Sequence, residues 1–325
     1  MKISSPGMGA YTKLIVELAN YLGWDFIPPP PPTERSIELG TTCLAAELIC
    51  LPAKVTLGSM IEACEQGATD LIMFDSCGTC RMKTYWILQQ RALRKLGYKA
   101  TVHPIRLGIH TARDLQRVGP TVPYWKVCKV LVKLLLGINE LDKKLWTETP
   151  QGDNHQVKIG IIGEIYSVLE PAVNKNLFRK LEKLGAVVHN SLPLTYFIFK
   201  RLYNWGWLKR RGIDRQTYLI AEKEAHKLLP KEVGGHGNES IIHTLYYAMR
   251  HFDGVVHVLP FPCMPESTVA PVLDDISRDY KIPVMRFVFD THTGEAGMDT
   301  RLEAFIDILK RKKAAHPPTL SQTVL

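Results

Sequence analysis

The sequence contains no long hydrophobic run. None of its apolar stretches approaches the roughly 18 uninterrupted residues that a membrane-spanning helix needs. The segment Met1–Met8 carries one lysine and lacks the apolar run of a signal peptide. A G-x-x-x-x-G-K-[ST] phosphate loop is also missing. We therefore expect a cytoplasmic protein with no membrane partner and no nucleotide site of the phosphate-loop type.

Acidic residues are in the minority. The chain has 41 lysines and arginines against 32 aspartates and glutamates, so its net charge is +9. Many of the basic residues fall in helical stretches, at Arg81–Lys99, Lys126–Lys144 and Lys200–Arg215. They are either ordinary solvated helix faces or a surface for an anionic partner, such as a coenzyme A ester or an acidic protein. No motif combining basic and aromatic residues accompanies the charge, so we expect no nucleic-acid partner.

The 325 residues, 46% of them hydrophobic, suffice for two ordinary α/β domains. Short apolar runs bounded by turn residues alternate with longer amphipathic stretches, which is typical of βα units around parallel sheets. In the first half we expect strands at Lys2–Ser5, Trp24–Ile27, Asp70–Asp75 and Lys99–Ile105, and helices at about Tyr11–Leu22, Val55–Gln66 and Met82–Leu96. Prolines at Pro28–Pro32 predict an extended connection.

A domain boundary is expected in the polar run Thr147–Gln156, after helices that fill Ala112–Leu145. The predicted domains are residues 1–150 and 157–325. In the second we expect strands at Lys158–Ile162, Ala186–His189, Gly254–Leu259 and Val284–Phe289, and helices at Asn174–Leu184, within Leu194–Leu229, and at Ser240–Arg250, Ser267–Tyr280 and Met298–Lys310.

The chain has seven cysteines, an odd count with uneven spacing, and a reducing compartment disfavours disulfides. Cys64 and Cys128 fall inside predicted helices and are expected to be core residues. The other five lie at or near the ends of predicted strands, or in the loops that follow them, where open α/β sheets place their ligand sites. They are Cys43, Cys50, Cys77, Cys80 and Cys263.

The surroundings of these five cysteines suggest how they are used. Cys77 and Cys80 form a CxxC turn, which can bind one metal or form a redox disulfide. If the segment between Cys43 and Cys50 is helical, both thiols lie on one face, with Pro52 interrupting the helix afterwards. Cys263 lies among three prolines after a strand.

Two kinds of metal site compete for these thiols. Structural zinc sites usually draw four ligands as two close pairs, whereas here single cysteines come from distant loops. An iron–sulfur cluster with three protein cysteines and one open iron fits this arrangement better.

Several longer motifs resemble a known family. They are ELICLPAKVTLG at Glu47–Gly58, GEIY at Gly163–Tyr166 before Pro171 and Asn174, GGHGNES at Gly234–Ser240, DGVVHVLPFPCMPE at Asp253–Glu266, and DTHTGEAGMDTRLEAF at Asp290–Phe305. The sequence resembles the D-component family of 2-hydroxyacyl-CoA dehydratases, which also includes benzoyl-CoA reductase subunits and double-cubane cluster proteins. Within it, the chain is most similar to the members related to acyl-CoA dehydratase activases.

The resemblance implies two Rossmann-like domains with mainly parallel sheets and a cluster in the cleft between them. It implies a separate ATP-hydrolysing activator as reductant, a small-molecule or acyl-CoA substrate, and a homodimer. Cys50, Cys263 and one of Cys77 or Cys80 match the cluster cysteines of the family. Cys43 and the other CxxC cysteine are extra, so both a [4Fe-4S] and a double-cubane [8Fe-9S] cluster remain open.

Other side chains are weaker candidates. Gly235 and Gly237 could offer N–H groups to an anion, and His236 could relay a proton. Glu164, after a predicted strand, is a candidate acid–base group or an ordinary helix cap. Glu266, Glu295 and His292 follow strand ends and could line the same cleft, and Lys54 and Arg81 could lower thiol pKa values or meet a coenzyme A phosphate.

Three functional classes stay open at this point. One is a cluster-dependent reductase or a dehydratase-like hydro-lyase subunit. The second is a non-catalytic electron-transfer or cluster-carrier component, and the third is a zinc- or thiol-based protein.

Overall fold

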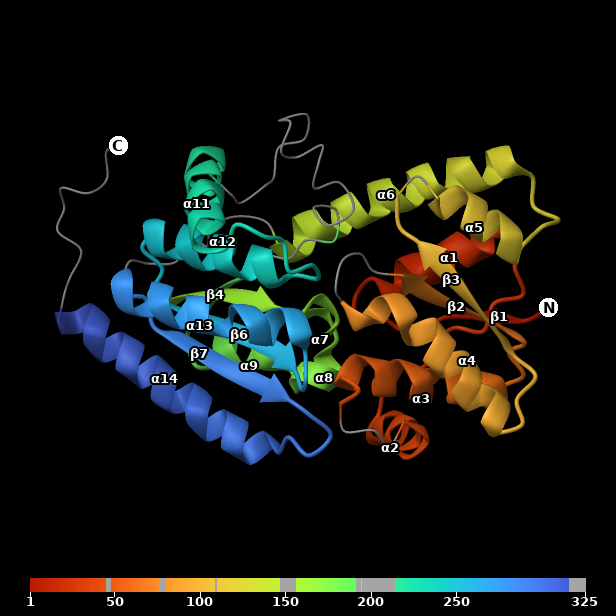
Figure 1. The fold of residues 1–325 in the computed structure, drawn as a ribbon, viewed down its shortest axis with the longest axis horizontal. Helices are drawn as coiled ribbons and strands as arrows, with labels where there is room; N and C mark the ends of the chain where they lie inside the picture. The colour runs from red at the N-terminus through yellow and green to blue at the C-terminus, as the bar shows by residue number, and fades with distance from the viewer. Residues whose placement is uncertain are drawn as a thin grey trace.

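Two parallel β-sheets lie side by side, and helices cover both faces of each (Figure 1). Among the described residues, the first sheet has three strands in the order β1-β2-β3, and the second has four in the order β5-β4-β6-β7. The computed structural model describes residues 1–44, 48–75, 80–108, 110–146, 156–190, 194 and 214–315. The prediction of an α/β fold with two Rossmann-like domains is confirmed.

The first sheet is built by alternation of apolar side chains along its strands. Leu71 and Met73 pack on one face against α3 and α4, whereas Ile72 and Ile105 pack on the other against α1, α5 and α6. Its strands are β1 (Ile3–Ser4), β2 (Asp70–Asp75) and β3 (Thr101–Arg106). Its helices are α1 (Thr12–Leu22), α2 (Glu34–Cys43), α3 (Leu51–Glu65), η1 (Arg81–Thr84), α4 (Tyr85–Lys95), α5 (Thr111–Val118) and α6 (Tyr124–Trp146).

The segment Trp24–Ile27 does not form the full strand that its sequence predicts. Phe26 makes one isolated parallel bridge with Ile3, supported by main-chain bonds from Ile3 N to Asp25 O and from Ile27 N to Ile3 O, each of 2.8 Å. The partner strand β1 has two residues. Prolines begin at Pro28 and have no N–H to donate, so the pairing cannot extend.

Helix α2 was not predicted, and it crosses α3 at very close range. Gly40 of α2 faces the backbone of Lys54, and Gly58 of α3 faces the backbone of Ser36. A side chain at either glycine would collide with main-chain atoms, so the two helices can approach this closely only because both positions lack a Cβ. Nearly all of α3 is buried as a result.

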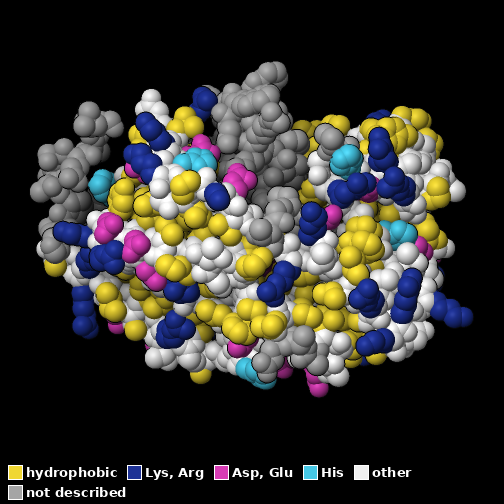
Figure 2. Space-filling model, viewed as in Figure 1, with side chains coloured by type: hydrophobic (Ala, Val, Ile, Leu, Met, Phe, Trp, Pro, Cys, Tyr) yellow, Lys and Arg dark blue, Asp and Glu magenta, His cyan; other side chains and the backbone are white. Residues whose placement is uncertain are grey.

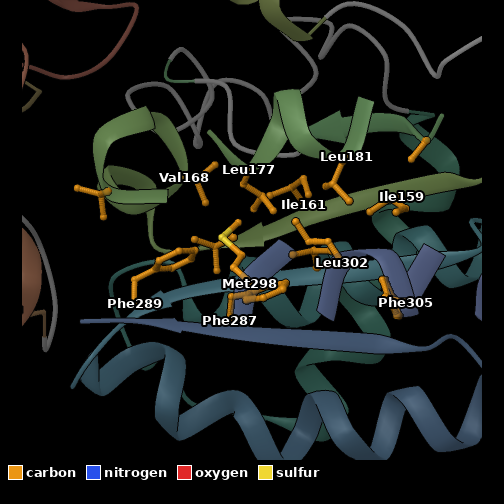
Figure 3. Close-up of a cluster of buried hydrophobic side chains, with 14 of the residues drawn as sticks. Ile159, Ile161, Val168, Leu177, Leu181, Phe287, Phe289, Met298, Leu302 and Phe305 are labelled. Carbon is orange, nitrogen blue, oxygen red and sulfur yellow. The ribbon is translucent and has the colours of Figure 1, made fainter. Parts of the chain in front are cut away.

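The second sheet carries the larger core. Ile159 and Ile161 of β4 face α7, α9 and α14 (Figure 3), whereas Ile162 and Val255 face α11, α12 and α13. Its strands are β4 (Lys158–Gly163), β5 (Val187–Asn190), β6 (Gly254–Pro260) and β7 (Val284–Phe289). Its helices are α7 (Ile165–Leu169), α8 (Pro171–Asn174), α9 (Leu177–Lys183), α11 (Arg215–Leu228), α12 (Gly237–Met249), α13 (Met264–Asp279) and α14 (Glu295–Ala315).

Contacts between the two halves hold the sheets against each other. Leu51 and Val55, at the start of α3, belong to the core of the second sheet. The N–H of Gly9 donates to the Glu170 carboxylate over 2.9 Å. These contacts leave the carboxyl ends of β2, β4 and β6 facing a shared space.

The predicted domain boundary, Thr147–Gln156, falls mostly at 147–155, outside the described residues.

The outer surface is mixed in character. Lysine and arginine side chains are scattered over both halves on the face shown in Figure 2. None of the described helices combines the length and the apolar composition that crossing a bilayer requires.

Candidate functional site

A cavity of about 510 Å³ lies between the two domains. Its walls include Asp75 at the end of β2, Glu164 directly after β4 and Cys263 in the turn after β6. Open parallel sheets place ligand sites at the carboxyl ends of their strands, and here both sheets contribute to one such site.

Cys263 is held by the turn that follows β6. Its N–H donates to the carbonyl of Pro260 over 2.7 Å. The residue caps the start of α13 and is 7% exposed. A buried residue on a turn anchored at both ends has little conformational freedom, so its thiol has a defined position at the cavity wall.

Cys50 and Cys80 come from the first domain and lie near Cys263. Cys50, 7% exposed, caps α3, and the next N–H, of Leu51, donates to the carbonyl of Phe261 over 3.3 Å. Cys80 lines the same cavity as Cys263. Cys50 interacts electrostatically with both of the other cysteines. Cys80 and Cys263 line one end of the cavity, and Cys50 lies close to them without lining it, so three thiols from segments far apart in the sequence come near one another.

The buried thiols are difficult to ionise. Burial raises the pKa of Cys50 to about 11, although a hydrogen bond with the Tyr85 hydroxyl and the charge of Arg81 oppose the increase. Burial also raises the pKa of Cys263, and the nearby Glu266 and Glu164 carboxylates add to this effect. Thiolates here would need a positive charge beside them, which iron would supply. These thiols are therefore suited to a cluster, and binding of the cluster would release the thiol protons.

The remaining predicted cysteines are placed differently. Cys43 ends α2, is partly buried, and lies near Tyr98 together with Cys64; it does not line the cavity. Cys77 lies outside the described residues.

The condition that Cys43 and Cys50 share one helix is not met by the described residues between them, because 44 and 48–50 are not helical. Helix α2 ends at Cys43, and a new helix, α3, begins at Leu51. Pro52 stands in the first turn of α3, where a missing N–H costs nothing, so this proline starts a helix and does not interrupt one.

Glu164 both caps a helix and lines the cavity. Its carboxylate accepts the N–H groups of Tyr166, over 2.9 Å, and Ser167, over 2.8 Å, at the start of α7. Both interpretations of this residue from the sequence are thus compatible with its position.

The glycine segment before α12 also reaches the cavity. Gly235, in the left-handed region at φ +59°, and His236 line its wall. A Cβ on Gly235 would lie 3.7 Å from the Cβ of Cys80 and 2.9 Å from Pro265, so glycine lets this loop approach the cysteine turn. Gly237 begins α12 and packs on Pro265 without lining the cavity.

Glu266 is the centre of a network that the sequence did not predict. The residue is fully buried, and its Oε2 accepts hydrogen bonds from Ser240 Oγ and His257 Nε2, each over 2.8 Å. Arg286 Nε lies 3.4 Å from His257 Nδ1 and Arg286 Nη2 bonds Asp274 near the surface over 2.8 Å. A histidine in the middle of the apolar run GVVHVLP was the signal that such a partner exists.

Some atoms of the cavity wall have no hydrogen-bond partner within the described part of the chain. Among them are Asp75 Oδ1, Glu266 Oε1 and the Tyr166 hydroxyl; Glu266 and Tyr166 are buried, and Asp75 is half-buried. Buried polar atoms are normally satisfied, so unpaired ones beside a cavity indicate a partner that the described residues do not supply.

The other candidates do not line the cavity, although Arg81 lies close enough to Cys50 for its charge to lower the pKa of that thiol. Glu295 pairs with Lys180 over 3.2 Å, and His292 is exposed; neither lines the cavity. Lys54 is buried within α3, and the Arg81 guanidinium bonds the Leu48 carbonyl.

Among the residues described, no three His, Cys, Asp or Glu side chains form a group that could hold one metal ion. Thiolates on a single zinc ion lie about 4 Å apart, because each Zn–S bond is about 2.3 Å. Ligands of a cluster bind different irons and are spaced more widely.

No protein-family model matches this sequence, and no curated protein matches it either.

Proposed function

We propose that this protein holds an iron–sulfur cluster at the end of the interdomain cavity, with Cys50, Cys80 and Cys263 as ligands. The observation that carries the proposal is the approach of thiols from three distant segments: Cys80 after β2 and Cys263 after β6 line the cavity, and Cys50 at the start of α3 lies near both. Cys77 belongs to the proposal as a further ligand of a larger cluster. Cys43 does not, because it lies with Cys64 near Tyr98, whereas Cys50 interacts with Cys80 and Cys263.

A bound cluster supplies one-electron chemistry at low potential. Three cysteine ligands leave one iron of a [4Fe-4S] cluster without a protein ligand, and the adjoining cavity gives a small molecule access to that end of the site. We infer a reductase- or dehydratase-type role from this access, since a carrier has no need of a substrate cavity. An ATP-hydrolysing activator as electron donor and a homodimeric assembly are parts of the same proposal.

The residues around the thiols have defined tasks in this proposal. Tyr85 and Arg81 favour ionisation of Cys50, by a hydrogen bond and a positive charge respectively. The turn from Pro260 to Cys263 and the start of α3 are joined by the Leu51–Phe261 hydrogen bond, which keeps ligands of the two domains in register. The buried Glu266, next to the cavity, keeps one carboxylate oxygen without a partner among the described residues.

Metal and sulfide analysis of protein purified without oxygen tests the proposal. We expect at least four irons per chain with matching acid-labile sulfide, the content of one cubane. The Cys263→Ala variant should lose most of this iron. The Cys128→Ala variant is the matched control, because Cys128 lies on α6 and does not line the cavity, and it should keep its iron.

Equal iron content in the two variants would contradict the ligand assignment. Zinc without iron in the wild-type protein would exclude the cluster altogether. A change in the electron paramagnetic resonance signal on adding a small ligand would demonstrate an accessible iron, whereas an unchanged signal with full iron content would favour the carrier role.

A further inference from the structure

Away from the cysteines, the interdomain cavity is a long aliphatic pocket. Its walls there come from α1, α6 and one face of the first sheet, with Leu14, Leu18, Ile72, Ile105, Leu134 and Ile138 among them. These side chains belong to, or pack on, the core clusters of the first domain and its junction with the second. A volume of about 510 Å³ is large for a packing defect and falls within the range of ligand pockets.

The charged groups around this cavity have one sign. Asp75, Glu164 and Glu266 line it, and no lysine or arginine does so in the part of the chain that the structure describes. An anionic head inside the cavity would lose its hydration, meet no cation and face carboxylates. Burying a charge without a partner is strongly unfavourable, so carboxylates and phosphates are poor occupants.

The polar atoms at the thiol end suit an uncharged hydrogen-bonding group. Glu266 Oε1 and the Tyr166 hydroxyl are buried and have no partner among the described residues. Burial holds the pKa of Tyr166 well above its usual range, so its hydroxyl stays protonated and can donate. A hydroxyl group on a ligand can donate to a carboxylate oxygen or accept from a tyrosine.

We propose that the cavity binds an uncharged ligand with an aliphatic body, whose polar end lies near Cys263 and whose chain extends between α1 and α6. The inference that this ligand is the substrate rests on the proposed cluster function. The inference that the cavity binds such a ligand does not depend on the cluster. Coenzyme A phosphates, should a thioester bind, stay outside this cavity. Free carboxylic acids are rejected.

A displacement assay tests the proposal. The uncharged fluorescent probe N-phenyl-1-naphthylamine is bound to the full-length protein and displaced with hexan-1-ol or with hexanoate at pH 7. We expect hexan-1-ol to compete at least tenfold more strongly than hexanoate. Affinity should also rise about fourfold for each methylene from butan-1-ol to hexan-1-ol, the increment for burying one CH₂.

Two α6 positions give a matched pair of variants. Leu134→Trp fills the cavity and should reduce hexan-1-ol affinity at least tenfold, whereas Leu136→Trp, at a position on the same helix that is 61% exposed and outside the cavity, should leave it unchanged. Should Leu134→Trp fail to fold by circular dichroism, Leu107→Trp takes its place. Leu107 lines the cavity and is 38% exposed, so a larger side chain there can be accommodated.

The possible outcomes separate the two proposals. Equal displacement by hexan-1-ol and hexanoate, absence of displacement, or equal loss in the Leu134→Trp and Leu136→Trp variants would each overturn the ligand class. Iron and sulfide are measured on the same preparations. If the protein binds the alcohol but contains no iron, the cluster proposal is refuted and the ligand proposal stands. If it contains iron but does not bind the alcohol, the ligand proposal is refuted and the cluster proposal stands.

Discussion

The close crossing of α2 and α3 gives a sharp test of how the first domain is built. The perturbation is Gly58→Ala. An ideal Cβ at Gly58 would lie 1.7 Å from the carbonyl oxygen of Ser36, half of the 3.4 Å at which ordinary contact begins. The colliding atom belongs to the backbone, and Ser36 is itself fully buried, so no side-chain rotation can relieve the overlap.

Two opposing terms set the magnitude. Adding a methyl to a well-packed contact costs about 1–3 kcal/mol, and a main-chain collision belongs near the upper end. Replacing glycine by alanine inside a helix returns about 1 kcal/mol. The net expectation is a loss of about 2 kcal/mol in the free energy of unfolding. Since α3 begins immediately after Cys50, the displaced helix should also lower iron content.

Urea denaturation followed by tryptophan fluorescence measures this loss. With a urea dependence of about 2 kcal/mol per molar, the midpoint should fall by roughly 1 M. Gly297→Ala is the matched control, because Gly297 also lies in a helix, α14, but an added Cβ there would meet nothing within 4 Å. That variant should be as stable as the wild type or more stable, by up to about 1 kcal/mol.

An unchanged midpoint in Gly58→Ala would refute the reasoning, because it would mean that α2 and α3 do not approach each other through these glycines. Equal losses in the two variants would do so too, since the cost would then be unrelated to the crossing.

Two carboxylates predict pH effects of opposite sign. Burial raises the pKa of Glu170, despite the hydrogen bond from Gly9 N, so its ionised form is disfavoured in the folded state. Wild-type stability should therefore fall relative to Glu170→Gln as pH rises from about 4 towards 7, as thermal melts at each pH will measure; a constant difference would contradict this. Hydrogen bonds from the Arg106 guanidinium lower the pKa of the buried Asp114. The ionised Asp114 carboxylate therefore stabilises the folded protein above about pH 4, and this stabilisation is lost on acidification. Asp114→Asn should cost about 1–3 kcal/mol at pH 7, and the cost should shrink progressively as the pH falls below about 4; a cost that stays constant in acid would show that charge is not its origin.

The strands of both sheets are where sequence reasoning worked best. The predicted bounds Asp70–Asp75 and Val284–Phe289 are those of β2 and β7. Buried parallel strands are short continuous apolar runs between turn residues, a pattern that depends little on distant partners. By contrast, Trp24–Ile27 has a strand-like composition but lacks a neighbour long enough to pair with.

Helix α2 shows why some elements could not be predicted. Its sequence, ERSIELGTTC, has a glycine and β-branched residues in its last turns and no strong apolar stripe. It is helical because a capping box at Thr33 starts it and because Gly40 lets it rest on the backbone of α3. The contact with α3 depends on a different part of the chain, so the local sequence of α2 could not predict it.

For the site, the residue pattern identified candidate positions, and only the family resemblance implied that Cys50, Cys263 and one of Cys77 or Cys80 meet. The pattern placed Cys50, Cys80 and Cys263 at strand ends or in nearby loops, and topology alone then brings such residues to one edge of each sheet. Which cysteines lie near one another depended on how the two sheets face each other. The residue pattern offered both Cys43 and Cys263, the resemblance matched only Cys263, and in the structure Cys43 lies at the end of α2 near Tyr98.

The sequence by itself determined the α/β class, most strands and the cysteine-bearing loops, because these follow from local hydrophobic periodicity and turn chemistry. Tertiary structure alone decided the cavity, its aliphatic walls and the buried pairing of Glu266 with His257. Those properties arise only when surfaces from distant parts of the sequence pack against each other and exclude water. Burial, and with it the cost of an unpaired charge, exists only once both surfaces are in place.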